Sequence, residues 1–253
     1  MALPNIEQWH ADHLRLTIFV DKIDSVEPSV LWERLTGSKP EVITSKPQSG
    51  EVSAFGPYRD NLTLELKTTL NRLDIIINSK LDPVIGLMAI PSIGTISIIQ
   101  ELLSNLSEIL FKEWKSNVLR LAVGTNMNVR IDDSRSGYAV LKEMLPFLGF
   151  DLDLVSDFSM QLNASRPSRA DVGLMLNRIV KWAVARVEFG SIPFGNLSST
   201  VQHYGRLELD FNTPADHKLP LVLEHLNSIV NELSGDVLSL LKGGGSWLLS
   251  KES

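Results

Sequence analysis

Histidines close to a carboxylate are the first residues to consider for chemistry. The segment "HADH" places His10 and His13 on either side of Asp12. A His-x-x-His pair can share a helix face and bind a transition metal when other residues complete the site. Two ligands do not make a metal site, and the sequence contains no HExxH motif. The pattern therefore favours exposed histidines, and no metal ligand is assigned.

A second pattern combines two carboxylates with a lysine. The segment "PYRDNLTLELK" carries Asp60, Glu65 and Lys67. In metal-dependent nucleases, carboxylates on separate strands hold a divalent ion, and a lysine stabilises the nucleophile or the phosphate. Here both acids fall on one strand or its approach, so a solvated strand face is the favoured interpretation. A metal-dependent nuclease remains the weakest of three functional hypotheses.

Hydrogen-bonding side chains recur at alternate positions of three predicted strands. Alternation at period two directs such residues to one face of a sheet. An amide-rich face can bind a polar ligand or a protein partner, although the wet face of a one-sided sheet has the same pattern. The candidate residues are Asn126, Asn128, Arg130, Gln161, Asn163, Arg206, Glu208 and Asp210.

The C-terminal segment "KGGGSWLLSKES" joins three glycines to an apolar group. Glycine costs roughly 1 kcal/mol relative to alanine inside a helix, so the preceding helix is predicted to end near Lys242. Residues 243–253 would then form a flexible tail. On this tail, Trp247, Leu248 and Leu249 are predicted to dock onto another subunit, with burial in the chain's own core as the alternative.

The composition excludes several kinds of chemistry. The chain of 253 residues has no cysteine, which rules out disulfides, thiolate nucleophiles and cysteine-bound metal clusters. No phosphate-binding glycine loop or nucleophile elbow occurs, and no cofactor is expected. A net charge of −6 and the absence of a basic run disfavour nucleic acid as a partner, because binding a polyanion requires clustered cations.

Hydrophobic periodicity predicts the elements that position these groups. Period-two alternation predicts strands, and apolar residues spaced by three and four predict amphipathic helices. The predicted strands cover residues 14–20, 62–67, 72–78, 117–131, 153–163, 179–189 and 204–212. The predicted helices cover residues 27–37, 95–114, 132–149 and 219–241.

The two halves of the chain repeat one order of predicted elements: strand, helix, strands, long helix. Arg15-Leu16 and Arg120-Leu121 open the two halves, 105 residues apart. We therefore predict an α+β fold, with one or more antiparallel sheets and two long amphipathic helices, that arose by tandem duplication. The first half covers residues 1–116 and the second 117–242, and the halves can form one compact domain.

An uncharged run of eighteen residues follows Asp82 and begins "PVIGLMAIPSIG". A membrane span needs about 20 mainly apolar residues, and this run is short and interrupted by proline and glycine. We predict a buried connector, with an apolar lip on a pocket as the alternative. No membrane association is expected. The N-terminal sequence lacks the apolar stretch of a secretory signal, so the cytoplasm is the expected compartment.

Taken together, these patterns favour a non-enzymatic cytoplasmic protein that binds another protein or itself, as a subunit of a larger complex. The first alternative is a small-ligand-binding protein or an enzyme with its pocket between the polar sheet face and the segment 83–94. The metal-dependent nuclease is the second alternative. No catalytic residue is assigned.

Overall fold

One antiparallel sheet spans both predicted halves of the chain. The computed structural model describes residues 3–21, 27–59, 61–80, 89–149, 157–191, 198–217 and 219–250. The strands are β1 (Trp9–Val20), β2 (Val42–Lys46), β3 (Glu51–Tyr58), β4 (Leu62–Thr69), β5 (Arg72–Ser79), β6 (Val118–Ile131), β7 (Ser159–Pro167), β8 (Met175–Ser191) and β9 (Ser198–Asn212). Within the described residues they form a nine-stranded sheet in the order β2-β3-β4-β5-β1-β6-β9-β8-β7. The strands that open the two predicted halves, β1 and β6, are therefore neighbours near its centre.

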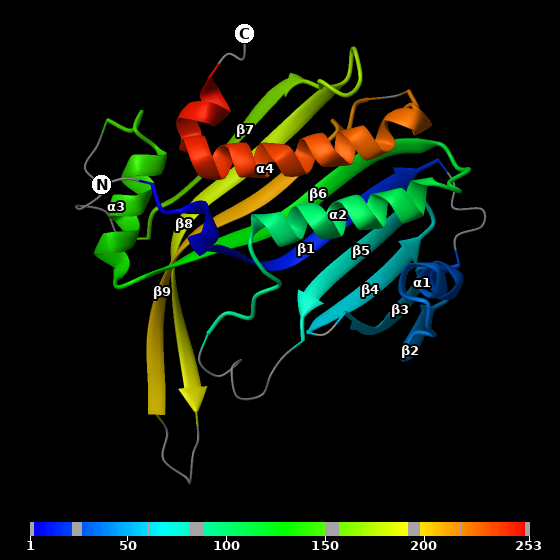
Figure 1. Ribbon diagram of the computed structural model, residues 1–253, viewed down its shortest axis with the longest axis horizontal. Helices are drawn as coiled ribbons and strands as arrows, with labels where there is room; N and C mark the ends of the chain where they lie inside the picture. Colours follow the sequence, from blue (N-terminus) through cyan, green and yellow to red (C-terminus); the bar gives the residue numbers. More distant parts are fainter. Residues whose placement is uncertain are drawn as a thin grey trace.

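The α-helices lie on one side of this sheet. They are α1 (Pro28–Thr36), α2 (Ile96–Phe111), α3 (Ser134–Met144) and α4 (Leu226–Leu249), with short 3-10 helices at Ile6–Gln8 and Leu223–His225. Figure 1 shows α2 and α4 side by side across the sheet, with α1 and α3 nearer its two ends. The strand residues that point away from the helices form what we call the open face. It includes Arg15 (β1), Glu65 (β4), Asn78 (β5), Asn126 (β6) and Glu208 (β9).

Alternate strand residues fill the core between the sheet and the helices. On β1, the side chains of Leu14, Leu16 and Ile18 are at most 1% exposed. They belong to one continuous cluster with helix residues such as Leu103 and Leu233. Burying a leucine or isoleucine side chain contributes roughly 1.5–3 kcal/mol. The period-two pattern therefore decides which sheet face meets the helices.

Local sequence signals explain where two of the helices begin and end. Pro28 is the first residue of α1, and Gly37 follows its last residue with a φ of 71°, which glycine adopts without strain. The carboxylate of Asp133 caps α3 by accepting a hydrogen bond from the backbone N–H of Ser136 at 2.7 Å. This hydrogen bond lowers the pKa of Asp133.

The predicted α+β fold with a large antiparallel sheet is confirmed. The sequence pattern does not predict β2 and β3. Strand β2 is exposed along its whole length, so it lacks the alternation of a half-buried strand. Among the described residues, no helix has both the length and the hydropathy of a membrane span.

Helix α4 is interrupted at Gly244, two residues after the point where the sequence predicts its end, and a second helical segment continues to Leu249. The first segment passes Gly235 without a break. Gly244 has non-helical dihedrals inside it, with a φ of 57°, and a Cβ there would lie 2.8 Å from the carbonyl oxygen of Met144. Because glycine has no Cβ, the chain can bend at this point and pack its last turns against α3.

The described part of the uncharged run lies beside the start of β1. Ile93 is buried, its backbone N–H donates to the carbonyl oxygen of Ala11, and the N–H of Ala11 donates to Gly94, each at 2.8 Å. Within residues 89–94, Ile93 is buried as predicted, whereas Ser92 is exposed and the others are half-buried. Residues 83–88 of the run lie outside the described residues.

Candidate functional site

Two arginines flank Phe19 on the open face. The register places Phe19 opposite Arg72 on β5 and opposite Arg120 on β6. The guanidinium carbon of Arg120 lies 4.7 Å from the centre of the Phe19 ring, and that of Arg72 lies 5.9 Å from it. Both distances suit cation–π contacts, so the ring holds the two guanidinium groups close together.

Arg15 completes a three-arginine cavity of about 90 Å³ on this face, which we call the arginine pocket. Its walls are Arg15, Thr17, Phe19, Arg72, Arg120, Ala122, Asp210 and Asn212. A Cβ at Gly124, opposite Arg15, would lie 3.1 Å from the Arg15 guanidinium nitrogen Nη2. The absence of a side chain at Gly124 therefore gives the Arg15 guanidinium its place beside β6.

The arginine pocket has more cations than anions. Arg72 forms an ion pair with the buried carboxylate of Asp74, and Arg15 lies 3.8 Å from Asp210. Arg120 donates a hydrogen bond to the carbonyl oxygen of Thr213 at 3.2 Å, and among the described residues it has no ion pair. Three guanidinium groups therefore face two carboxylates, which leaves the pocket locally positive.

A second polar cluster forms where β1 bulges. Between Ala11 and Leu14 the pairing with β6 shifts, so that Asp12 and His13 lie opposite Asn126. A β-bulge changes the direction of side chains and is common beside binding sites. The His13 ring nitrogen Nδ1 lies 2.6 Å from the Asp12 carboxylate, and the Asn126 amide donates to the same carboxylate at 3.3 Å.

Side chains from β6 and β9 complete the cluster at Asp12. The amide of Asn128 donates to Asp12 at 3.4 Å, and the guanidinium of Arg206 lies 3.3 Å from it. Burial alone would raise the pKa of Asp12, but the hydrogen bond with His13 and the charges of His13 and Arg206 lower it. Asp12 is therefore held as an anion.

The structure brings together only some of the predicted site residues. Asn126, Asn128 and Arg206 meet at Asp12. Glu208 pairs with Arg206 and with Lys181, and Asp210 faces Arg15. The other predicted residues of this face lie apart: Arg130 is exposed near the end of β6, and Gln161 and Asn163 are exposed on the edge strand β7.

The predicted tail residues pack on the chain's own surface. Leu248 is 1% exposed, whereas Leu249 is 53% exposed. The guanidinium of Arg166 donates to the carbonyl oxygens of Trp247 and Leu248, and it also lies over the Trp247 indole ring at 5.1 Å. Residues 243–249, expected to be part of a flexible tail, are the last turns of α4.

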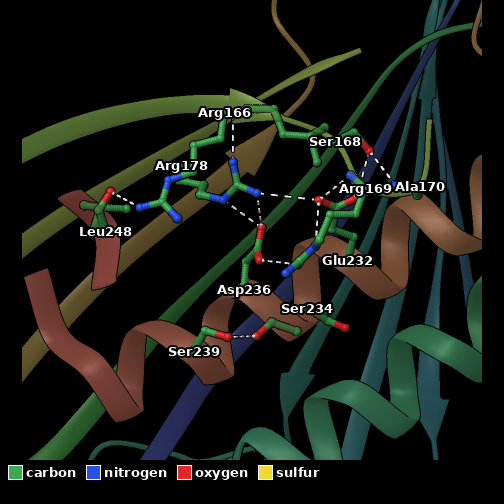
Figure 2. Close-up of polar contacts among 12 residues, drawn as sticks. Arg166, Ser168, Arg169, Ala170, Arg178, Glu232, Ser234, Asp236, Ser239 and Leu248 are labelled. Carbon is green, nitrogen blue, oxygen red and sulfur yellow. Dashed lines mark hydrogen bonds and ion pairs between the residues drawn. The ribbon is translucent and has the colours of Figure 1, made fainter. Parts of the chain in front are cut away.

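A buried ion-pair network holds α4 to the β7–β8 hairpin (Figure 2). The Arg178 guanidinium, 1% exposed, contacts the carboxylate of Asp236 at 2.6 Å. Glu232 accepts hydrogen bonds from the backbone N–H groups of Arg169 and Ala170. Burial raises the pKa of Asp236, although the charges of Arg178 and Arg169 oppose this shift. Every partner of this network is a group of the protein, so we assign it to stability.

The nuclease pattern of the sequence is not assembled in the described structure. Lys67 forms an ion pair with Glu51 at 2.7 Å, and Asp60 lies outside the described residues. Within the residues that are described, no three histidine or carboxylate side chains are grouped to hold a metal ion.

The sequence pattern identifies Asp210 as a candidate residue, but not the arginines of the arginine pocket. Arg15, Thr17 and Phe19 are the alternate residues of a predicted strand, Arg72 opens a second strand, and Arg120 lies near the start of a third. That alternation shows that they share a face, but not that β1 lies between β5 and β6. The pocket depends on this strand order.

Comparisons with known proteins give little support for a family. No protein-family model and no curated protein matches the sequence. Among solved structures, the chain is similar to a rolling circle replication initiator protein from Geobacillus stearothermophilus. The TM-score is 0.30 and the sequence identity is 12%, over 93% of this chain and 84% of that chain.

This similarity conflicts with two expectations from the sequence, which are corrected. One is that the chain is a non-enzymatic subunit that binds proteins, and the other is that nucleic acid is disfavoured as a partner. The second expectation depended on net charge and on runs of basic residues, and neither quantity detects cations that come from separate strands. At this TM-score the similarity assigns no function to the chain.

Proposed function

We propose that the chain binds a strand of nucleic acid on the open face of its sheet. The observation that carries this proposal is the arginine pocket, in which Arg15, Arg72 and Arg120 surround Phe19. Arginine recognises phosphate through its planar fork of donors. An aromatic ring among arginines on a sheet surface also suits single strands, whose bases stack on aromatic and guanidinium planes.

The negative net charge does not prevent such binding. Interactions between exposed charges are largely screened beyond about 8–10 Å at physiological ionic strength. Contact with a phosphate is therefore decided by the nearest groups, and Arg120 is a cation without an ion pair among the described residues. The net charge of −6 acts at long range, so it lowers the rate of association with nucleic acid more than it weakens the contact between Arg120 and a phosphate.

The amide-rich part of the open face supports the same proposal. Asn126 lies half-buried on β6, the strand that also supplies Arg120, whereas Asn128 on the same strand is buried against Asp12. Asparagine can pair with base edges through its amide donor and acceptor. Phosphate contacts in the pocket would position the strand, and amide contacts would distinguish bases.

Fluorescence anisotropy with labelled oligonucleotides, single-stranded and duplex, tests the proposal. Arg120→Gln removes the cation, and Arg34→Gln is the matched control, because Arg34 lies on α1 and pairs with Glu113 at 2.9 Å. We expect Arg120→Gln to weaken binding and to lower the salt dependence by about one released counterion. The control should bind as the natural protein does. No strand binding, or equal affinities of the two variants, would contradict the proposal.

We further propose that the two halves of the sheet derive from a tandem duplication, with the boundary near residues 116 and 117. The order of elements supports this: β1, α1, β2 to β5 and α2 are followed by β6, α3, β7 to β9 and α4. The arginines that open the two halves, Arg15 and Arg120, then contribute to one pocket. We also propose the cytoplasm, the compartment expected from the sequence, as the location of the protein.

A further inference from the structure

We propose that a second cavity on the open face receives an unpaired base of the bound strand and prefers guanine. This inference rests on the proposed binding of nucleic acid. The cavity has a volume of about 750 Å³ and lies between the bulge of β1, strands β3 to β5 and the segment that follows them. Its volume falls within the range of roughly 300–1,000 Å³ that is typical of small-ligand pockets.

Apolar side chains supply flat walls for a ring. Phe55 of β3 lines the cavity and is 38% exposed, so its ring is accessible. Pro57 lies on the same strand, and Ile90 and Pro91 line the cavity from the segment after β5. Loss of an aromatic side chain on which a base stacks weakens single-strand binding by roughly five- to a hundredfold.

Glu41 lies next to Phe55 and supplies a carboxylate to the lining of the same cavity. The backbone N–H of Glu41 donates to the carbonyl oxygen of Phe55 at 2.9 Å, which holds the two residues together. Glu41 is an exposed residue of the cavity wall, and among the described residues no hydrogen bond or ion pair involves its carboxylate. A carboxylate with free lone pairs accepts two parallel hydrogen bonds from neighbouring donors.

Asn78 and Lys80 complete the polar part of the cavity. The Asn78 side chain has no hydrogen bond to another described residue, and its amide can donate to a carbonyl oxygen. Lys80 is exposed at the cavity and has no ion pair in the described part of the chain, so it can meet a phosphate. Asp12 adds a second carboxylate, already held by His13 and Arg206.

These groups match guanine better than the other bases. Guanine presents two adjacent donors, N1–H and N2–H, which one carboxylate can accept together, and its O6 accepts from an amide. Uracil and thymine place their single N–H between two carbonyl oxygens. A carboxylate that accepts from this N–H would bring its second oxygen against a carbonyl oxygen, and these two acceptors repel each other. Adenine and cytosine place an acceptor nitrogen beside their amino group. A good bidentate contact discriminates against the wrong base by roughly five- to a hundredfold.

Competition by oligonucleotides that differ at one unpaired base tests the inference. We expect the natural protein to prefer guanine by roughly tenfold or more, the discrimination of a bidentate contact. Glu41→Gln should remove this preference while the affinity for a thymine strand stays nearly unchanged. Phe55→Ala should weaken binding of every base. Glu65→Gln is the matched control, since Glu65 lies on the open face outside the cavity and should leave the preference intact.

The results separate this inference from the proposed function. If strands bind without guanine preference, or if Glu41→Gln keeps the preference, the base pocket is wrong and strand binding survives. If no strand binds but free guanosine binds by calorimetry and Glu41→Gln abolishes this binding, the base pocket is supported and the proposed function fails. If neither a strand nor guanosine binds, both are wrong.

Discussion

Arg15 and Arg120 show how single side chains gain a role from the pairing of two strands. Each begins an Arg-Leu pair that looks ordinary in the sequence. Because β1 and β6 run antiparallel, Arg120 lies opposite Phe19 and Arg15 lies opposite Gly124. Guanidinium groups from the two halves therefore share one pocket, and Gly124 leaves room for one of them.

The titration of Asp12 is expected to affect stability. Its pKa is lowered because the hydrogen bond with His13 and the charges of His13 and Arg206 outweigh burial. A carboxyl with a lowered folded-state pKa stabilises the fold above its unfolded-state pKa, and this contribution is lost as pH falls through the folded-state pKa.

We therefore expect Asp12→Asn to lower the free energy of unfolding at neutral pH. The difference from the natural protein should shrink as the pH falls below about 3.8, the ordinary pKa of the group. Urea unfolding of both proteins across this pH range measures the effect. A difference that stays constant over the range would show that the charge of Asp12 does not stabilise the cluster.

Helix α4 depends on one glycine for its path. Gly244 combines a φ of 57° with a close approach to the backbone of Met144. Gly235 lies in the same helix, and a Cβ there would have no other atom within 4 Å. Substitution of these two glycines by alanine is therefore expected to have opposite effects on stability.

We expect Gly244→Ala to lower the free energy of unfolding by about 1–3 kcal/mol, because alanine meets both strain at positive φ and a clash with Met144. Gly235→Ala, the matched control, should raise it by up to about 1 kcal/mol through helix propensity. Denaturant unfolding followed by circular dichroism compares the two. Equal effects of both substitutions would mean that Gly244 is not needed for the bend.

The strands of the described residues form one sheet, and the C-terminal residues pack against the same core. Strands β1 and β6 pair near the centre of the sheet, and α2 and α4 pack side by side over it (Figure 1). The last turns of α4 add Leu248 to the same core and are held by Arg166. The apolar C-terminal residues are therefore part of this fold.

We expect truncation after Lys242 to lower the melting temperature by the same amount at all protein concentrations. Loss of the buried Leu248 side chain alone removes roughly 1.5–3 kcal/mol of stabilisation from apolar burial. Differential scanning calorimetry over a wide range of concentrations, with the mass in solution measured alongside, tests this. If truncation lowers the melting temperature only at high protein concentration and also reduces the mass in solution, the C-terminal residues instead dock between subunits.

Much of the fold could be predicted from periodicity, because burial imposes a period of two on strands and of 3.6 on helices. The alternation of Leu14, Leu16 and Ile18 with Arg15 and Phe19 already separates a core face from an outer face. Proline at the start of α1 and glycine after its end likewise predict its bounds. Strand β2 escapes prediction because it is exposed on both faces.

The candidate site depended on contacts between residues far apart in the chain. Strand order places Arg72 and Arg120 on either side of Phe19, and a bulge places Asp12 opposite Asn126. Neither leaves a local pattern, because alternation within one strand decides which face a side chain occupies, but not which strands become neighbours or where a bulge shifts the pairing. The same holds for the C-terminus, where three glycines predict an end but contact with Met144 makes a bend. Local sequence thus decides which face a residue occupies, and packing between strands and helices decides its neighbours.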